Sequence, residues 1–134
     1  MYMKDRYKIS AGCVYNINYH LVWCPKYRKP VLTDEVAKDL KKLIEQKARE
    51  LNIEIGGFEI MPDHIHLFVS SKPTLPIHFI VQQFKGFTSH ELRNKYEQLK
   101  KKLPTLWSRS YYVGTAGFVS DSVIKNYIAH QKGK

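Results

Sequence analysis

The stretch Met61-Pro62-Asp63-His64-Ile65-His66-Leu67-Phe68-Val69-Ser70 decides the fold. Pro62 and Asp63 have the composition of a turn, and apolar and polar side chains alternate from His64 onward. Because successive side chains of a strand point to opposite faces, Ile65, Leu67 and Val69 share one face and the two histidines share the other. The pattern predicts a strand over residues 64–70 with an apolar face and a histidine-bearing face.

Three more strands are expected on either side of this stretch. Residues 13–23 alternate in the same way up to Pro25, with Tyr15, Ile17, Tyr19, Leu21 and Trp23 on one face. Residues 53–61 are rich in β-branched side chains but contain Gly56 and Gly57, which indicates a bulge or a close backbone approach. The last strand is expected over residues 110–115.

Helical spacing of apolar residues predicts three helices. The first is capped by Thr33 and runs to about Leu51, and the second runs from Thr74 to about Tyr96 with Pro76 in its first turn. The basic stretch through Lys102 and Pro104 is expected to be a loop. Beyond a junction bracketed by Gly114 and Gly117, a terminal helix is expected from Ser120 or Asp121 to near Gly133.

This order of elements predicts an α+β, ferredoxin-like (RRM-like) fold with two helices on one face of an antiparallel sheet, plus a C-terminal helix. We expect one domain over 1–134, with a core at about 13–115 and the final helix at about 120–132. The first and third strands should be neighbours at the sheet centre. The helix-facing residues would be Ile17, Leu21, Ile65, Leu67 and Val69, and the open face would display Asn16, Asn18, His20, His64 and His66.

The charge balance points to a polyanionic partner. Twenty-two Lys and Arg against twelve Asp and Glu give a net charge of +10, and the basic residues gather among aromatics near Lys26–Lys29 and within 93–109. A merely basic protein is the alternative reading. The only two cysteines, Cys13 and Cys24, are too far apart along one extended strand for a disulfide. No apolar run is long enough for a membrane span and residues 1–10 are polar, so a cytoplasmic location is expected.

Four residues have the types and spacing of a catalytic site. His64 and His66 would project from the same side of a strand and could bind one ion, although such pairs are often ordinary surface histidines. Tyr127 and Gln131 are four residues apart and would share one face of the terminal helix. Periodicity alone also fits Tyr127 as a packed aromatic, because Ile128 and other apolar residues occupy the same arc.

Four segments together resemble a known family. They are Tyr19-His20-Leu21-Val22-Trp23-Cys24-Pro25-Lys26-Tyr27-Arg28, Met61-Pro62-Asp63-His64-Ile65-His66, Leu106-Trp107-Ser108-Arg109-Ser110-Tyr111-Tyr112-Val113-Gly114 and Tyr127-Ile128-Ala129-His130-Gln131. In order and spacing they are similar to the single-tyrosine HUH transposases of the smallest prokaryotic insertion sequences, from about Cys13 to Gln131. The combination is more specific than the His-hydrophobe-His element alone, which recurs in replication initiators and relaxases.

The resemblance implies a role for each of the four residues. His64 and His66 match the metal-binding pair, Gln131 the third protein ligand and Tyr127 the nucleophile. Two imidazoles and an amide oxygen without a thiolate favour Mg²⁺ or Mn²⁺ over a structural zinc ion. The implied activity is cleavage and rejoining of single-stranded DNA at insertion-sequence ends through a covalent 5′-phosphotyrosine link.

The resemblance also implies DNA hairpins as partners and a homodimer with composite active sites in a prokaryotic cell. No phosphate-binding glycine loop is present, so no nucleotide cofactor is expected. Asp63 is interpreted as a turn residue, and His78, His90 and His130 as bystanders. Candidate DNA-binding residues are His20, Lys26, Arg28, Lys29, Lys85 and Arg109, with a second-shell role as the other possibility for His20.

Two other functions remain open at this point. An RRM-like module could bind nucleic acid without catalysis, but its aromatic signature is missing from the strand that carries His64 and His66. A metal-dependent hydrolase that uses water would not need Tyr127. Covalent capture of DNA by the protein would separate all three.

Overall fold

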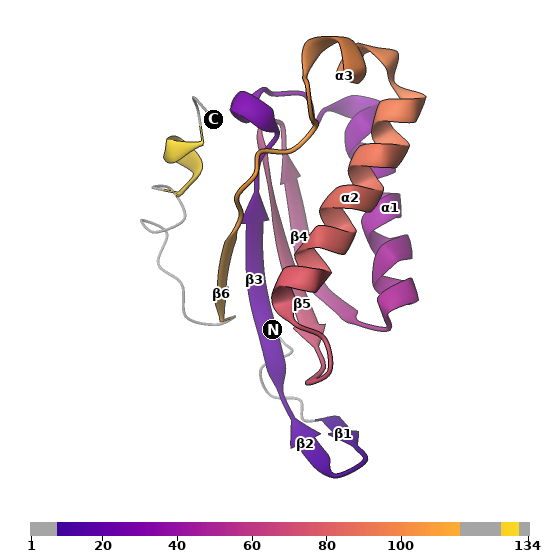
Figure 1. The fold of residues 1–134 in the computed structure, drawn as a ribbon, viewed down its shortest axis with the longest axis vertical. Helices are drawn as coiled ribbons and strands as arrows, with labels where there is room; N and C mark the ends of the chain where they lie inside the picture. The colour runs from indigo at the N-terminus through magenta and orange to yellow at the C-terminus, as the bar shows by residue number, and fades with distance from the viewer. Residues whose placement is uncertain (1–7, 116–126, 132–134) are drawn as a thin grey trace.

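The computed structural model describes residues 8–115 and 127–131. Within these ranges, a four-stranded antiparallel sheet has the order β4-β5-β3-β6, and a separate hairpin, β1-β2, projects from one end (Figure 1). The strands are β1 Lys8–Ser10, β2 Cys13–Tyr15, β3 Ile17–Trp23, β4 Glu54–Met61, β5 His64–Ser71 and β6 Tyr112–Thr115. The helices are the 3-10 turn η2 Lys26–Arg28, α1 Asp34–Leu51, α2 Ile77–Lys95 and α3 Glu97–Lys102.

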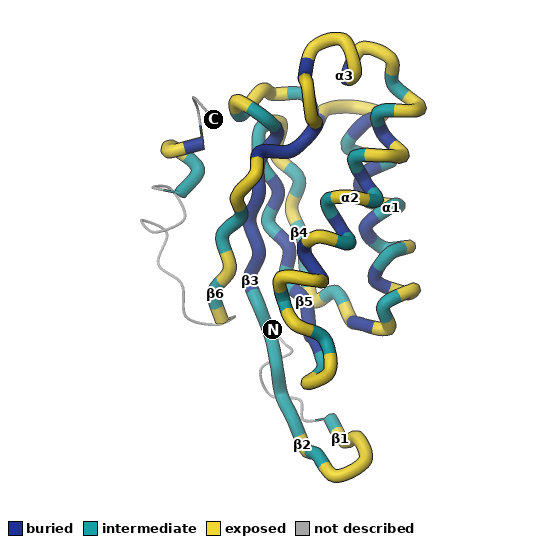
Figure 2. Tube along the Cα trace, viewed as in Figure 1, coloured by how far each residue is buried: buried dark blue, intermediate teal, exposed yellow. Residues whose placement is uncertain are grey.

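The two central strands are β3 and β5, as predicted. Leu21 lies opposite Leu67, and Val22 lies opposite His66. Both α1 and α2 pack on one side of the sheet, and burial is concentrated on β3, β5 and the inner sides of these helices (Figure 2). The predicted α+β fold, with two helices covering one face of an antiparallel sheet, is therefore confirmed.

The predictions of the first helix and of the bulge hold, whereas α2 begins at Ile77 rather than at Thr74, because a proline disfavours helical backbone at the residue before it. Thr33 is the N-cap residue of α1, although its side chain makes no capping hydrogen bond, and Pro76 is the N-cap residue of α2. The pairing of β4 with β5 shifts register between Ile55 and Gly57, which is the bulge expected at the two glycines. Both cysteines are free.

One continuous strand was predicted over residues 13–23. This prediction was wrong, because the structure has two strands there. Cys13–Tyr15 pairs with Lys8–Ser10, whereas Ile17–Trp23 pairs with β5 and β6. Alternation continues through Asn16, but the hydrogen-bonding partner changes there. A period-two pattern reports which face a side chain occupies and contains no information about which strand lies alongside.

The loop expected after residue 96 contains α3, so that prediction was also wrong. Leu99 is buried against the core, and this single apolar anchor holds the short helix in place. Glu97 lies in its first turn and Lys100–Lys102 lie in its last, which suits the helix dipole at both ends. Six residues are too few to produce a visible helical period.

The last strand begins at Tyr112 rather than at residue 110. The carbonyl groups of Ser108 and Ser110 accept hydrogen bonds from Lys85, so this segment lies against a side chain of α2 before β6 begins. Residues 127–130 are helical, and the rest of the helix expected at 120–132 lies outside the described residues. Within the described residues, no helix has the length and apolarity of a membrane span.

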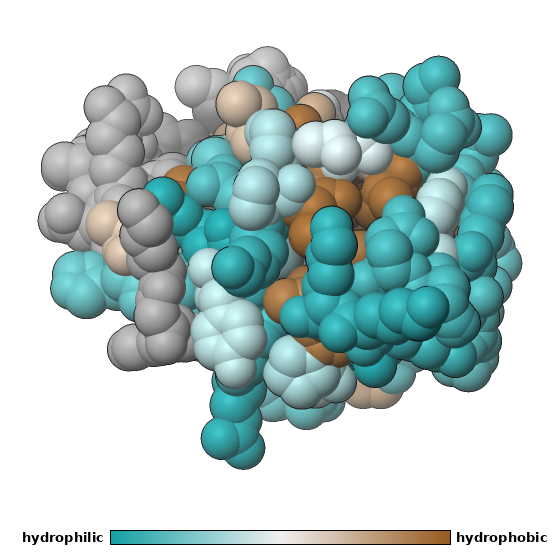
Figure 3. Space-filling view, turned by 90° about the horizontal axis from the view of Figure 1, so that it is seen from above, coloured by the Kyte–Doolittle hydropathy of each residue, from teal (hydrophilic) through white to brown (hydrophobic). Residues whose placement is uncertain are grey.

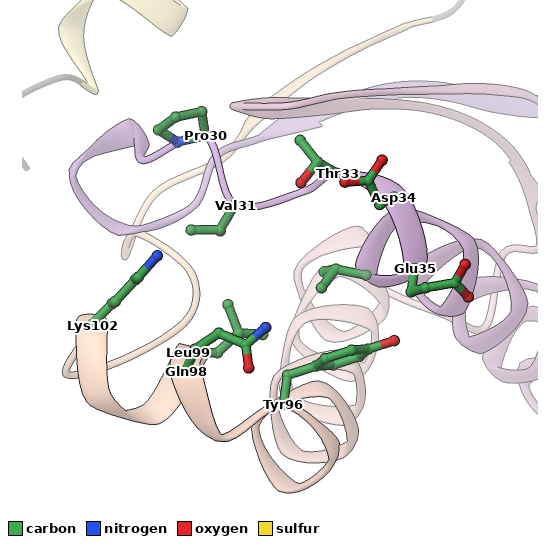
Figure 4. Close-up of a pocket in the computed structure, with 10 residues that line it drawn as sticks. Pro30, Val31, Thr33, Asp34, Glu35, Tyr96, Gln98, Leu99 and Lys102 are labelled. Atoms are coloured by element: carbon green, nitrogen blue, oxygen red, sulfur yellow. The ribbon is translucent and has the colours of Figure 1, made fainter.

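The end of the molecule seen from above in Figure 3 is mainly hydrophilic, with a narrow apolar strip between the polar side chains. The basic α3 lies at this end (Figure 1). A groove of about 380 Å³ lies between the start of α1 and α3, lined in part by Thr33, Tyr96 and Lys102 (Figure 4). No histidine lines it, and it lies on the helix side of the sheet.

Candidate active site

The histidine pair lies on the sheet face opposite to α1 and α2. Ile65 and Leu67 are fully buried in the helix-facing core, so alternation turns His64 and His66 to the other face. Their ring centroids are 5.0 Å apart and the rings meet edge to face. Both imidazoles can therefore reach a common point in front of the sheet.

Each of these imidazoles has a partner at its Nδ1 atom. Nδ1 of His64 lies 2.8 Å from a carboxylate oxygen of Asp63, and Nδ1 of His66 lies 3.1 Å from Nε2 of His20. Such contacts fix the ring orientation of a metal-binding histidine. They leave Nε2 of both rings as the atom that would coordinate an ion.

Burial favours the neutral form of His20 and His66. The pKa of His20 is lowered to about 4 by burial and by His66, and the pKa of His66 is lowered by burial and by His64. Both rings are therefore neutral at pH 7. The neutral imidazole is the form that binds a metal ion.

His20 lies on the predicted face but is not displayed to solvent, because only 4% of its surface is exposed. Its ring stacks on Phe68 at a centroid distance of 4.3 Å and meets the ring of Tyr112 edge-on at 6.0 Å. This burial leaves little surface for DNA. Its contact with Nδ1 of His66 instead favours the other possibility, a role behind a proposed metal ligand.

The helical segment with Tyr127 and Gln131 lies on the same face of the sheet. The ring of Tyr127 is 6.2 Å from that of Tyr112, which in turn contacts His20. The amide oxygen of Gln131 accepts hydrogen bonds from the hydroxyls of Ser110 at 2.9 Å and Ser108 at 3.3 Å. Because the Ser110 hydroxyl donates to Gln131, it can accept from the Tyr127 hydroxyl, which is 3.3 Å away.

The phenol of Tyr127 is held in its protonated form. Burial raises the pKa of Tyr127 to about 12, and the hydrogen bond with Ser110 acts in the opposite direction but is the smaller effect. A reaction that uses this oxygen as a nucleophile must therefore remove its proton during attack.

Arg28 connects the terminal helix with the histidine strand. Its Nε atom lies 3.1 Å from Asp63, and its Nη1 atom donates to the carbonyl oxygen of Ile128 at 3.3 Å. Arg28 was expected from the sequence to contact DNA, and its link to Asp63 and Ile128 was missed. The only indication of this link in the sequence was that Asp63 directly precedes His64.

Ser108 and Ser110 were also missed as site residues. They are separated by one residue, and the hydroxyls of both reach the amide oxygen of Gln131. The Ser-x-Ser spacing was visible in the sequence, but serines are common in loops and the pattern has little specificity alone.

The remaining DNA-binding candidates differ in their accessibility. Lys29 and Arg109 are exposed, and the ammonium of Lys26 lies 5.2 Å from the ring centroid of Tyr27. The ammonium of Lys85 instead donates to the carbonyls of Ser108 at 2.7 Å and Ser110 at 3.1 Å. Burial lowers the pKa of Lys85 to about 8. Its charge is directed into the protein.

Comparison with known proteins places this chain in a class of transposases. Residues 13–131 match the family model of IS200-like transposases, and the chain belongs to that family. It is 39% identical over 129 residues to the ISDra2 transposase TnpA of Deinococcus radiodurans, covering 95% of this chain and 92% of that protein. It is 30% identical to the transposase of insertion sequence element IS200 from Salmonella typhimurium, covering 92% and 82% of the two proteins.

Solved structures agree with this assignment. A candidate transposase from Deinococcus radiodurans R1 superposes with a TM-score of 0.85 at 34% identity, covering 95% of this chain and 99% of that one. A REP-associated tyrosine transposase bound to a REP hairpin gives a TM-score of 0.57, covering 92% of this chain and 66% of its own. At 14% identity, the second likeness concerns the fold alone.

Proposed function

We propose that this transposase cleaves and rejoins single-stranded DNA at insertion-sequence ends, with Tyr127 as the nucleophile and Mg²⁺ or Mn²⁺ at His64 and His66. The observation that carries the proposal is the placement of the His64 and His66 imidazoles and the Tyr127 segment on one face of the sheet. Membership of the IS200-like family supports the same activity. Action on insertion-sequence DNA of a prokaryotic cell would take place in the cytoplasm.

The residues present fit a divalent ion. The Nδ1 partners Asp63 and His20 would hold the two Nε2 atoms toward it. Among residues 8–115 and 127–131, no three His, Cys, Asp or Glu side chains form a metal-binding group, and we propose an amide as the third protein ligand. The amide oxygen of Gln131 would be that ligand after it gives up a serine hydrogen bond. The bound ion would polarise a non-bridging oxygen of the scissile phosphate.

The chain's own groups account for the remaining chemistry. The Tyr127 oxygen forms a bond to phosphorus, the bond from phosphorus to the 3′-oxygen breaks, and the products are a 5′-phosphotyrosine and a 3′-hydroxyl. The phenol loses its proton and the leaving 3′-oxygen gains one. Because the new phosphodiester keeps the energy of the old one, another 3′-hydroxyl can reverse the reaction and join strands without a nucleotide cofactor.

Single-stranded DNA with hairpins at the element ends is the proposed partner. The net charge of +10 and the exposed Lys29 and Arg109 favour a polyanion. We further propose a homodimer with composite sites, in which the Tyr127 helix of one subunit serves the histidines of the other. In the single chain this helix contacts Arg28, Ser108 and Ser110 of the same chain, and in a composite site the helix of the partner subunit would make the equivalent contacts.

Covalent capture tests the proposal. Wild-type protein incubated with a single-stranded element end and Mn²⁺ should form a denaturant-resistant adduct, and Tyr127→Phe should bind the DNA but form none. Tyr111→Phe is the matched control, because the Tyr111 hydroxyl bonds to His78 rather than to the site. A non-catalytic binder or a water-using hydrolase would form no adduct. An adduct of wild-type yield from Tyr127→Phe would remove Tyr127 as nucleophile.

A further inference from the structure

The turn η2 has an unusual backbone at two consecutive residues. Tyr27 has a φ of 60° and Arg28 a φ of 52°, and neither residue is a glycine. L residues rarely adopt this left-handed region, and such residues persist where the surrounding structure holds them. The turn follows Pro25, which pairs with Trp107, and its first amide donates to the carbonyl of Leu106. The start of the turn is therefore anchored to the segment at Leu106 and Trp107.

This backbone directs the Arg28 side chain between two elements. One end of the guanidinium binds the Asp63 carboxylate, and another nitrogen binds the Ile128 carbonyl in the segment that carries Tyr127 and Gln131. The second carboxylate oxygen of Asp63 is the partner of His64 Nδ1. A continuous chain of contacts thus runs from the terminal helix through Arg28 and Asp63 to one of the two histidines.

We propose that Arg28 is a positioning residue that couples docking of the terminal helix to the orientation of His64. The planar guanidinium has several donors in a fixed geometry and can hold both partners at once, which a lysine ammonium cannot match. Its contacts to Asp63 and Ile128 occupy it inside the protein, in place of the DNA contact expected from the sequence. Loss of Arg28 would remove one contact that holds the terminal helix and one contact that holds the Asp63 carboxylate.

The coupling is reciprocal, because a free energy shared between two sites acts in both directions. Helix docking would thus raise the affinity of the histidine pair for an ion, and a bound ion would hold the helix closed. A change at Arg28 that breaks the link should free the helix and lower the ion affinity. The second effect depends on the proposed metal site, whereas the first concerns the protein alone. The two can be measured separately in the full-length chain.

The test uses Arg28→Lys and Arg28→Gln, with Arg49→Gln as the matched control because Arg49 is an exposed arginine in the last turn of α1. Hydrogen exchange in peptides that cover residues 127–131 should speed up about tenfold in both Arg28 variants without metal. The affinity for Mn²⁺, measured by calorimetry, should fall about tenfold, in line with losses of about 10- to 100-fold for second-shell changes. Arg49→Gln should match the wild type in both measurements.

Asp63→Asn tests the same chain of contacts at the residue that joins Arg28 to His64. It removes the charge that Arg28 binds, and it should weaken Mn²⁺ binding and loosen the helix together. Wild-type exchange over residues 127–131 in Arg28→Lys would overturn the proposal, and so would faster exchange with unchanged Mn²⁺ affinity. A loss of DNA affinity alone would identify Arg28 as a DNA contact instead. Absence of an adduct from wild-type protein would contradict the proposed function and leave the exchange result intact.

Discussion

Nε2 of His20 lies 3.1 Å from Nδ1 of His66, across the two central strands β3 and β5. Because only 4% of the His20 surface is exposed, this contact, rather than a DNA contact, is the role we propose for it: it would orient the His66 ring in the proposed metal site. We predict that His20→Leu lowers Mn²⁺ affinity about 10- to 100-fold, because His66 loses its Nδ1 partner. His20→Gln, whose amide can still bond to Nδ1, should retain more of the affinity. Calorimetry on both variants checks this, and equal affinities would contradict it.

The metal-free protein should lose stability in mild acid. The pKa of His20 is about 4 in the folded protein against about 6.5 when unfolded, so between these values the unfolded chain binds more protons. His20 therefore makes its full contribution to the free energy of unfolding above about pH 6.5 and loses it as the pH falls toward about 4. This contribution is on the order of 3 kcal/mol at most. Urea unfolding from pH 7 to 4 measures it. His20→Gln should flatten this dependence, while His90→Gln, which removes an exposed histidine, should not.

Ser110→Ala should slow cleavage more than it weakens DNA binding. The Ser110 hydroxyl holds the Gln131 amide and accepts from Tyr127, and its hydrogen bond opposes the rise in the tyrosine pKa. Its removal should raise that pKa further and shift the alkaline limb of the cleavage rate to higher pH. Single-turnover rates from pH 7 to 10 test the shift. Ser108→Ala, with its longer contact of 3.3 Å to Gln131, should have a smaller effect.

The exposed basic residues should determine how binding responds to salt. The logarithm of DNA affinity should fall with that of salt, and Lys29→Gln or Arg109→Gln should each reduce the slope by about 0.7 if it contacts a phosphate. Lys85→Met should leave the slope unchanged, because its ammonium binds the Ser108 and Ser110 carbonyls. It should instead destabilise the fold by about 1–3 kcal/mol through the unpaired carbonyls. A reduced salt slope for Lys85→Met would show that its charge reaches DNA.

Mixing two inactive variants tests whether subunits share active sites. In a heterodimer of His64→Ala with Tyr127→Phe, composite sites would place both defects in one site and none in the other, so cleavage should return after subunit exchange. If each helix serves its own sheet, every site keeps one defect. Heterodimers must be confirmed with differently tagged subunits. An inactive mixture that contains them would rule out composite sites.

Local patterns in the sequence determined the main elements and the face on which each side chain lies. Alternation placed His64 and His66 on one side of β5, the two glycines marked the bulge in β4, and the spacing of Tyr127 and Gln131 put them on one helix face. These features follow from backbone periods of two and 3.6 residues, which operate over a few neighbouring residues. The resemblance added roles that periodicity alone did not supply.

Only the tertiary structure decided which distant residues meet. Arg28 and Ile128 are separated by 100 positions, His20 and His66 by 46, and Ser110 and Gln131 by 21. The change of strand partner at Asn16 and the anchoring of α3 by Leu99 depend in the same way on what lies alongside. Such contacts form when the chain packs, because hydrogen bonding and burial depend on distance in space. The periodicity of a local stretch describes only neighbours along the chain, so it does not predict the distance between remote residues.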